Sequence, residues 1–584
     1  MKVLLTALNS KYIHTNLAVR YLHEFSIQRG YPCQICEYTI NQHLPDILDE
    51  IYRQSPDVLM LSCYIWNIEM MLDLAEEYRR ICPDVTIIAG GPEVSYQSQQ
   101  ILEKNPALDG ILRGEGEQSF LEYQQYLAKE RPIEEVSSLV WRDESGTIHT
   151  NPEAPLLDMA LLPFPYPDLE SLSDKILYFE SIRGCPFRCS YCLSSVAGRV
   201  RYMPLPMVFE RLQKFLDARV RQVKFVDRTF NCSKEYSMAI WKYLSEHDNG
   251  ITNFHFELTA HLIDDEMIEF LKTVRRGLFQ FEIGVQSTNP DTIREIRRTT
   301  DTERLLSVCR KLDEAKNIHL HLDLIAGLPY ENLESFGNSF DTVMQIRPQQ
   351  MQLGFLKVLK GSYMAQAAGE YGLVYSKKAP FQVIRTNWIS YDDLMLLKDM
   401  ETVVEDYYNS GLFSHQIGWM LDQEQSVFSF FLNFGRWKVA NGLRLIPQSF
   451  EDRCTTLKNY YLSCHSDRAS QLPLLHDLCL FDLCLHTKPK KLPDWVSTEQ
   501  NLVYKDQIRD FYRNESLMAE LFPARQNHDS KQLAKESHLQ ILSFDPITLQ
   551  NRPIAFLFDY SQRDLLGNAR FLDVSSYILY VKNN

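Results

Sequence analysis

The chain has 584 residues, of which 45% are hydrophobic and 23% are charged, and its formal net charge is −15. One hydrophobic core does not serve a chain of this length, so three or four domains are expected. The negative net charge argues against sequence-independent binding to nucleic acid backbones, because such binding needs clustered lysine and arginine. It is still compatible with an RNA substrate that binds in a local basic patch.

The expected cellular setting follows from what the sequence lacks. No apolar run approaches the ~18 residues that a membrane span requires. The apolar start gives way to polar residues after Leu8, so neither a membrane anchor nor a signal peptide is expected. Thirteen cysteines are scattered without the density of small secreted domains, which favours reduced thiols and a cytoplasmic protein.

Residues 1–130 alternate between short apolar runs and helical stretches. The apolar runs that predict buried strands are 2–8, 33–40, 57–64, 85–91 and 109–114. This alternation predicts an α/β, Rossmann-like domain with a parallel sheet and helices on both faces. Ligands of such sheets bind beyond the carboxyl ends of the strands, here the loops 9–16, 62–67, 90–93 and 114–117.

Residues 131–175 are predicted to form a connector. The segment 137–151 is typical of a hairpin that turns at Ser145-Gly146. Pro163, Pro165 and Pro167 then exclude a helix or a central strand, so an extended tether to the next domain is expected.

The run ILYFESIRG at 176–184 predicts a strand that leads into Cys185-Pro-Phe-Arg-Cys189-Ser-Tyr-Cys192. Three thiolates at this C-x₃-C-x₂-C spacing can wrap one face of a cubic iron–sulfur cluster. A four-iron cluster with three cysteine ligands keeps one iron open. A zinc loop is the alternative, but zinc motifs usually pair C-x₂-C units with a fourth ligand, and no Cys or His follows closely.

A second alternation of strand and helix patterns begins at 176. Its candidate strands are 176–182, 222–227, 254–258, 279–285, 319–328 and 351–359. Charged groups seldom sit unpaired among apolar strands, so those at the strand ends should face a ligand or each other. They include Asp227, Glu257, Glu282, Gln286 and Asp323. The structural alternative is a ring of salt bridges with Arg188, Arg199, Arg201 and Arg228.

The cysteine motif, with Tyr191 as the aromatic residue before its last cysteine, resembles the signature of the radical S-adenosylmethionine (SAM) superfamily. The resemblance implies a partial (β/α)₆ barrel over 176–370 and a [4Fe–4S] cluster on Cys185, Cys189 and Cys192. It also implies that the open iron chelates SAM. One electron, from an external flavodoxin- or ferredoxin-type reductant, then cleaves SAM to methionine and a 5′-deoxyadenosyl radical.

The same resemblance implies the residues that bind SAM. Glu282 and Gln286 belong to a stretch similar to the fourth-strand motif of the superfamily, and 324–329 resembles the fifth-strand motif. Asp227 stands where other members carry Gly-Gly-Glu for the SAM amine. The implied SAM-binding residues are Tyr191, Asp227, Glu257, Glu282, Gln286, Ile325 and Gly327.

The first domain resembles the cobalamin-binding domain found ahead of the cluster motif in one branch of the superfamily. The resemblance lies in Ser62 followed by Gly90-Gly91, and in RGEGEQSF at 113–120. It implies cobalamin contacts from Asn9, Ser62, Tyr64, Gly90, Gly91, Glu93, Gly114 and Glu115. KYIHTN around His14 lacks the Asp-x-His-x-x-Gly motif, which implies that cobalt has no lower histidine from the protein. The alternative is a Rossmann-like domain that binds a nucleotide or nothing.

Residues 371–584 carry no chemical motif. Aromatic-rich helical patterns are followed by strand patterns near the end, which predicts a mostly helical α+β domain that shapes a substrate pocket or binds a partner.

The resemblance favours a cobalamin-dependent radical SAM enzyme that methylates an unactivated carbon of a small molecule or peptide. The alternatives are rearrangement, cyclisation or methylthiolation without net methyl transfer, and a non-enzymatic iron–sulfur module that binds a protein partner.

Overall fold

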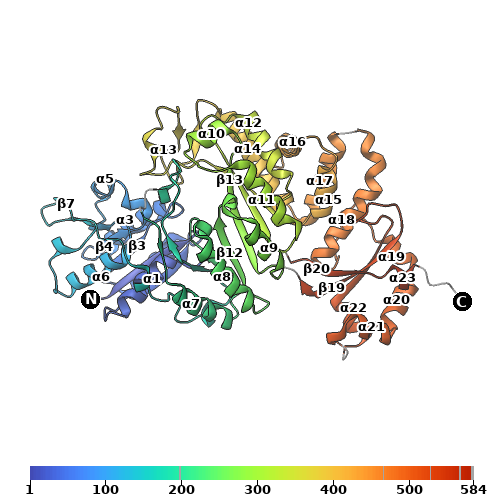
Figure 1. Cartoon of the computed structure of the whole chain (residues 1–584), viewed down its shortest axis with the longest axis horizontal. Coiled ribbons are helices and arrows are strands. Elements are labelled where there is room, and N and C mark those ends of the chain that lie inside the picture. Colours follow the sequence, from blue (N-terminus) through green and yellow to red (C-terminus); the bar gives the residue numbers. More distant parts are fainter. Residues whose placement is uncertain (196–198, 465, 526–527, 564–566, 580–584) are drawn as a thin grey trace. The chain divides into compact units, whose positions relative to one another are not determined.

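The computed structural model describes residues 1–195, 199–464, 466–525, 528–563 and 567–579 (Figure 1). They form two compact units: Met1–Pro348 with Gln352–Leu394, and Gln349–Met351 with Met395–Asn584. No helix within the described ranges is both long and apolar enough to cross a membrane.

The first unit begins with a seven-stranded sheet in the order β2-β1-β3-β4-β5-β6-β7. The first five strands run parallel, as the alternating pattern predicts. Their bounds are β1 Val3–Asn9, β2 Gln34–Thr39, β3 Val58–Ser62, β4 Thr86–Gly90 and β5 Gly110–Leu112.

The predicted hairpin is present, but it belongs to this sheet rather than to a connector. Its strands β6 (Leu139–Arg142) and β7 (Ile148–Thr150) add antiparallel to β5. The physical reason is that β5 has only three residues and would otherwise be an open edge. Pairing it with β6 also buries Leu139 and Val140.

Helices cover both faces of this sheet because its strands present apolar side chains alternately to each side. Leu4 packs with residues of α2 and α3, whereas Val3 and Leu5 pack with residues of α1 and α6. The helices are α1 Leu17–Ile27, α2 Leu44–Gln54, α3 Ile68–Ile81, α4 Pro92–Ser95, α5 Ser98–Lys104 and α6 Gly116–Leu127.

The second sheet has six strands in chain order, β8-β11-β12-β13-β14-β15, which matches the predicted partial barrel (Figure 1). Phe279 and Phe281 of β13 pack near Trp241 of α8, so the outer face is apolar. The strands are β8 Leu177–Phe179, β11 Gln222–Phe225, β12 Asn253–Leu258, β13 Phe279–Gln286, β14 His319–Ala326 and β15 Gln350–Phe355.

Helices connect these strands, and short strand pairs flank them. The connecting helices are α7 Leu205–Asp217, α8 Lys234–Glu246, α9 Asp265–Thr273, α10 Pro290–Glu295, α11 Thr302–Glu314 and α12 Leu333–Met344. Two further helices follow β15, α13 Tyr363–Gln366 and α14 Tyr391–Val403, and most of α14 belongs to the second unit. The expected cap of α10 is present, since the Asn289 side chain accepts a hydrogen bond from the Asp291 amide. The strand pairs are β9 Ile182–Arg183 with β10 Arg201–Tyr202, and β16 Val374–Tyr375 with β17 Val383–Arg385.

The second unit is a helical layer followed by an antiparallel three-stranded sheet, as expected for a mostly helical α+β region. Its helices are α15 Ser414–Leu421, α16 Val427–Ala440, α17 Phe450–Cys464, α18 Leu472–His486, α19 Glu499–Val503, α20 Lys505–Arg513, α21 Glu515–Leu521, α22 Ser530–Glu536 and α23 Ser575–Ile578. Its strands are β18 Ser537–Leu542, β19 Ile554–Arg563 and β20 Ala569–Asp573.

Candidate cluster and cofactor site

The three motif cysteines follow the first barrel strand on one loop. Cys189 is buried, while Cys185 and Cys192 are partly exposed. Burial raises the pKa of the Cys189 thiol, and the charges of Cys192 and Cys185 raise it further, so the three sulfurs lie within electrostatic range of one another. Three soft sulfur donors on one loop, two of them open to one side, fit the ligand set of an iron–sulfur cluster.

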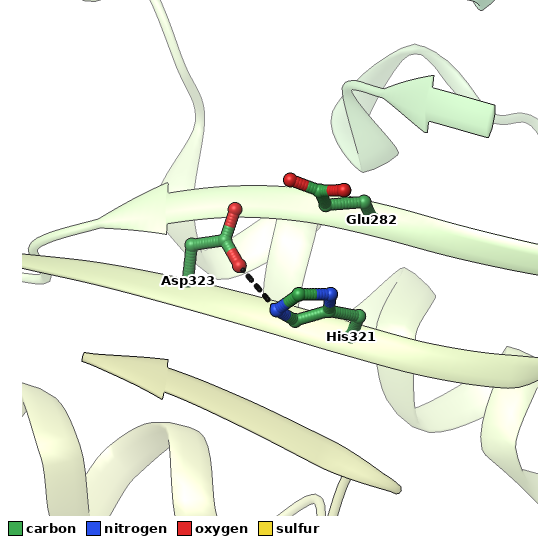
Figure 2. Close-up of side chains that lie close together, drawn as sticks. All are labelled: Glu282, His321 and Asp323. Atoms are coloured by element: carbon green, nitrogen blue, oxygen red, sulfur yellow. Dashed lines mark ion pairs between the residues drawn. The ribbon is translucent and has the colours of Figure 1, made fainter. Parts of the chain in front are cut away.

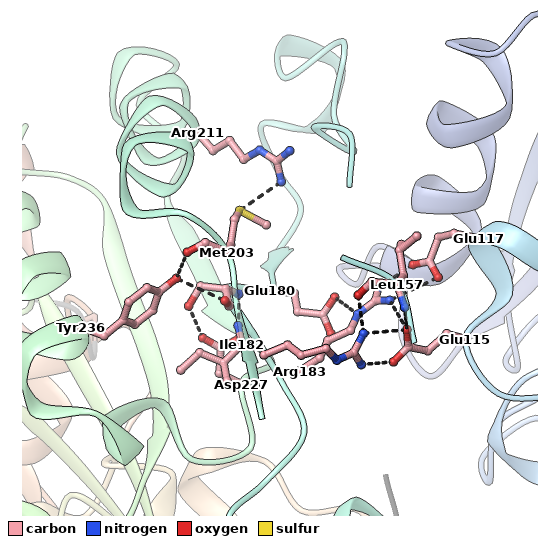
Figure 3. Close-up of polar contacts among 12 residues, drawn as sticks. Glu115, Glu117, Leu157, Glu180, Ile182, Arg183, Met203, Arg211, Asp227 and Tyr236 are labelled. Atoms are coloured by element: carbon pink, nitrogen blue, oxygen red, sulfur yellow. Dashed lines mark hydrogen bonds and ion pairs between the residues drawn. The ribbon is translucent and has the colours of Figure 1, made fainter. Parts of the chain in front are cut away.

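Asp227 holds the backbone that leads into this loop (Figure 3). Its Oδ1 accepts hydrogen bonds from the amides of Ser181 (2.8 Å) and Ile182 (2.9 Å), and its Oδ2 accepts one from the Ser181 hydroxyl. The side chain is fully buried. Both oxygens of Asp227 therefore anchor this backbone, and its predicted contact with the SAM amine stays a prediction.

Arg298 reaches the cluster loop from far along the sequence, and sequence reasoning did not single it out. Its Nη1 lies 4.0 Å from Cys189 Sγ and 3.4 Å from the Tyr191 hydroxyl, and its Nη2 donates to the Gly284 carbonyl at 2.6 Å. Its positive charge counteracts the rise of the Cys189 pKa. The only sequence signal was a run of arginines after α10, which is usually read as a solvated face.

Replacing Arg298 by methionine should make the reduction potential of a cluster on Cys189 more negative. The reason is that a cation and hydrogen-bond donor beside a ligating sulfur stabilises the more negative, reduced state. An EPR-monitored redox titration measures this shift. Arg294→Met, which removes an exposed arginine of α10, serves as the control, and an equal potential in wild type and Arg298→Met would contradict the role.

Charged side chains on neighbouring strands of the barrel pair with one another, and Figure 2 shows Glu282 beside His321 and Asp323. Lys224 Nζ lies 2.9 Å from Glu282, and His255 Nε2 lies 3.0 Å from the same carboxylate. His321 Nε2 lies 3.1 Å from Asp323. Of the four arginines in the alternative ring of salt bridges, Arg228 lies near these charged side chains, 3.9 Å from Glu257.

These ion pairs determine the protonation states of the charged side chains on the inner face of the barrel. Burial alone would raise the pKa of Glu282, but His255 and Lys224 outweigh it and the pKa falls well below its usual range. Burial raises the pKa of Glu257 and of Asp323. Glu282 is therefore held as a paired carboxylate, and Asp323 pairs with His321. Glu257 has only longer contacts, 3.8 Å to Lys224 and 3.9 Å to Arg228, and is the group more open to a polar ligand.

Gln286, Ile325 and Gly327 stand at the carboxyl ends of β13 and β14, where a SAM-binding edge is expected. Gln286 has φ +72° beside a bulge of β13, and its Oε1 is buried without a hydrogen-bond partner. Gly327 has φ +88°, and a Cβ there would lie 2.7 Å from Val383. An orphaned acceptor next to a strained turn fits a ligand-binding edge.

The residues predicted to contact cobalamin lie on the strand-end loops of the first sheet, and some of them already have partners. Asn9 donates to the His14 carbonyl (3.0 Å) and to Glu37 (2.8 Å). Glu115 is bound by Arg183 and Arg201. These two side chains therefore shape the loops, and any cofactor contact from them must be shared with these partners.

Other predicted positions stay available. Ser62 and Gly90 end neighbouring strands in register, and the Tyr64 ring stacks on Trp66 at 4.5 Å between centroids. Glu93 is buried, and its Oε2 has no hydrogen-bond partner but lies 4.0 Å from Lys360 Nζ. Burial raises the pKa of Glu93 against the opposing charge of Lys360. No atom lies within 4 Å of where a Cβ of Gly114 would stand. A flat aromatic surface, an orphaned acceptor and an open glycine loop fit a bulky polar ligand.

His14, the histidine nearest to these loops in sequence, is engaged with the barrel. Its Nδ1 lies 2.7 Å from the Tyr178 hydroxyl, and its backbone forms a parallel bridge with Ile176. The absence of a lower histidine from this loop stays a prediction.

Replacing Gly91 by alanine should destabilise the loop after β4. Gly91 has φ +107°, and a Cβ would lie 2.5 Å from the Cys63 carbonyl oxygen, so the loop must move. We expect a loss of ~1–3 kcal/mol in stability and weaker cobalamin retention, measured by thermal unfolding and by the absorbance of bound cobalamin. Gly146→Ala has a similar φ of +87° but no atom within 4 Å, so it should retain cobalamin fully.

Comparison with known proteins agrees with this geometry. Residues 3–124 match the family model of the B12 binding domain, and residues 179–343 match that of the radical SAM superfamily. The chain therefore carries a B12 binding domain followed by a radical SAM domain. Residues 369–558 match a further family described as "Protein of unknown function (DUF4080)".

Individual relatives are distant. The chain is 27% identical over 316 residues to the cobalamin-dependent radical SAM methyltransferase TokK of Streptomyces tokunonensis, a match covering 50% of this chain and 45% of TokK. Its fold is similar to that of the cobalamin-dependent S-adenosylmethionine radical enzyme OxsB, with TM-score 0.59, 16% identity, and coverage of 82% of this chain and 83% of OxsB. It is also similar to the radical SAM methyltransferase TsrM of Kitasatospora setae, with TM-score 0.55, 16% identity, and coverage of 64% and 78%.

Proposed function

We propose that this protein is a cobalamin-dependent radical SAM enzyme that transfers a methyl group to an unactivated carbon. The observation that carries the proposal is spatial. The cysteine loop at the barrel mouth and the strand-end loops of the B12 binding domain belong to one compact unit and are joined by the His14–Ile176 bridge and by Arg183. The relative TokK, which is named as a methyltransferase, supports the reaction class.

The residues have distinct roles in this proposal. Cys185, Cys189 and Cys192 hold a [4Fe–4S] cluster. Gln286, Glu257, Asp323 and the backbone around Ile325–Gly327 orient SAM, with Tyr191 packing beside the cluster. Ser62, Tyr64, Gly90, Gly91, Glu93 and Gly114 hold cobalamin. When bound, the cluster supplies an open iron for SAM and the electron that cleaves its sulfonium, and cobalamin supplies a carrier for the methyl group.

The protein's own contribution is positioning and exclusion of water. Burial shields the charged side chains on the inner face of the barrel from water, which strengthens the ion pairs between them. We further propose a small-molecule or peptide substrate, a cytoplasmic setting and a flavodoxin- or ferredoxin-type electron donor.

Anaerobic reconstitution with iron, sulfide, SAM, reductant and hydroxocobalamin tests the proposal. We expect 5′-deoxyadenosine, together with S-adenosylhomocysteine that forms only when cobalamin is present, because methyl transfer leaves that product. Formation of 5′-deoxyadenosine without cobalamin-dependent S-adenosylhomocysteine would favour rearrangement, cyclisation or methylthiolation. Absence of both products, in protein that holds four irons, would reject a radical SAM reaction.

A further inference from the structure

The cysteine loop begins and ends in a two-stranded ribbon, and each strand of this ribbon carries an arginine. Both arginines contact carboxylates of the B12 binding domain, and Figure 3 shows Arg183 beside Glu115 and Glu117. Arg183 of β9 pairs opposite Arg201 of β10, and between them lies the loop that carries all three cysteines. A Cβ on Gly184 would lie 2.8 Å from the Arg199 carbonyl, so the ribbon closes tightly. Any movement of the two arginines therefore moves both ends of this loop.

Carboxylates from the loop after β5 and from the first turn of α6 bind both arginines. Glu117 lies 2.5 Å from Arg183 Nη2 and 3.2 Å from its Nη1. Glu115 forms two contacts with Arg201 and lies 3.4 Å from Arg183. Glu180, in the barrel, completes the set at 2.9 Å from Arg183 Nε. The arrangement is a bidentate clamp, the strong geometry for guanidinium and carboxylate.

The clamp is buried, which makes it costly to break. The side chain of Arg183 is 12% exposed and that of Glu117 is 6% exposed. Burial alone would lower the pKa of Arg183, but Glu180, Glu117 and Glu115 raise it well above its ordinary value. Removing one partner of such a pair leaves an uncompensated buried charge.

The same short segment faces two cofactor sites. Gly114 and Glu115 belong to the loop predicted to contact cobalamin, and Arg183 precedes the first cluster ligand by one residue, Gly184. We propose that the pairs Glu117–Arg183 and Glu115–Arg201 couple cobalamin binding to the ordering of the cluster loop, so that each cofactor strengthens the binding of the other. This inference rests on the proposed function, and the coupling must be reciprocal because it is a difference of binding free energies.

Cobalamin titrations of full-length protein, with and without a reconstituted cluster, measure the coupling. In wild type we expect cobalamin to bind at least about 5-fold more tightly when the cluster is present, the lower end of typical coupling. Glu117→Gln, which keeps the shape of the side chain, should reduce this ratio to near one while the iron content stays measurable. The control is Lys214→Met, which breaks an exposed pair with Glu210 on α7 and should keep the wild-type ratio.

Two outcomes would overturn the coupling: a ratio of one in wild type, or an unchanged ratio in Glu117→Gln. If Glu117→Gln unfolds, Arg201→Lys provides the second variant, because it keeps the charge and loses the bidentate geometry. Failure of the proposed function is separately visible, since it would remove 5′-deoxyadenosine formation in wild type while leaving the two binding constants to be compared.

An independent observation lies in the second unit, where α17, α18, the segment 495–500 and β18 enclose a cavity of about 400 Å³. Leu462, Leu472, Pro473 and Ile541 supply its apolar wall. The volume is within the range of small-molecule sites.

The polar lining of this cavity includes two carboxylates, Asp477 and Glu499, as well as hydrogen-bond donors. His476 contacts Asp477 at 2.8 Å and accepts the Ser497 amide at 2.9 Å, and Asp477 accepts the amides of Ser543 and Phe544. By contrast, Trp495 Nε1 is buried without a hydrogen-bond partner. Lys458 Nζ stands 5.3 Å from the Trp495 ring centroid, and no carboxylate of the described residues pairs with it.

Since Lys458 and Trp495 Nε1 offer a cation and an N–H donor beside an apolar wall, with the Glu499 carboxylate in the same lining, we propose that the cavity binds a small organic anion at Lys458 and Trp495, with a carboxylate or phosphate on an apolar body. Calorimetric titration of the full chain with benzoate and phenyl phosphate tests this, with benzylamine and benzyl alcohol as cationic and neutral controls. Both anions should bind, and Lys458→Met should weaken them at least about 10-fold, the size of one charge-assisted hydrogen bond. Trp495→Phe, which keeps the ring, should weaken them less. Equal binding of benzylamine, no binding of either anion, or indifference to Lys458→Met would overturn the assignment.

Discussion

Replacing Cys189 by alanine should abolish the cluster and, with it, 5′-deoxyadenosine formation. Cys189 is the most buried of the three thiols, and the positively charged guanidinium of Arg298 lies 4.0 Å from its sulfur. A three-cysteine site has no spare protein ligand, so loss of one sulfur leaves a second iron open and the cluster labile. Iron and sulfide content, visible absorbance and 5′-deoxyadenosine yield should all fall to background in protein reconstituted beside wild type.

Cys232 provides the matched control for this experiment. It is a partly buried free thiol close enough to Cys185 for their charges to interact, and its Sγ lies 3.2 Å from the Tyr202 hydroxyl. It lies outside the motif, so Cys232→Ala should keep the iron content of wild type. Loss of iron in Cys232→Ala, with retention in Cys189→Ala, would show that the ligand set is wrong.

The sequence predicted the two sheets because buried parallel strands leave a simple pattern. Short apolar runs separated by amphipathic helices predict a parallel sheet whatever the exact residues of each run. The strands β11 to β14 lie where their apolar runs predict them. The cysteine motif was equally accessible, since its three cysteines lie within eight consecutive residues. What is local in sequence was predictable.

The errors and omissions concern partners that the fold brings from a distance. Asp227 has the composition of a ligand at a strand end, but only the structure shows that it binds the backbone of Ser181 and Ile182. Arg298 reaches Cys189 across 109 positions. The barrel charges, for which a ring of arginine salt bridges was the structural alternative, are met largely by lysine and histidine on neighbouring strands, because parallel register places Lys224 beside His255. Cross-strand pairing of this kind leaves no periodic signal in one sequence.

Replacing Asp227 by alanine should destabilise the first unit by ~3 kcal/mol, because it leaves two buried backbone amides without acceptors. Asp227→Asn should cost less than ~1 kcal/mol. Its carbonyl oxygen can accept both amides, while its amide can donate to the Ser181 hydroxyl. Because Ser181 and Ile182 lead directly into Arg183 and the cysteine loop, Asp227→Ala should also reduce iron content on reconstitution. Thermal unfolding and iron analysis of the two variants measure these effects, and equal behaviour of Ala and Asn would contradict the anchoring role.

The pH dependence separates the charge of Asp227 from its shape. Burial raises the pKa of this carboxyl to about 7, against the opposing effect of the hydrogen bonds that it accepts. An unfolded aspartate titrates near 3.9, so between about pH 4 and 7 the folded state keeps a proton that the unfolded state releases. Stability should therefore fall as pH rises through this window, by a few kcal/mol in total. Asparagine cannot ionise, so the unfolding temperature of Asp227→Asn relative to wild type should rise from pH 5 to pH 8. A difference that is constant or falls over this range would mean that the buried carboxyl is ionised throughout.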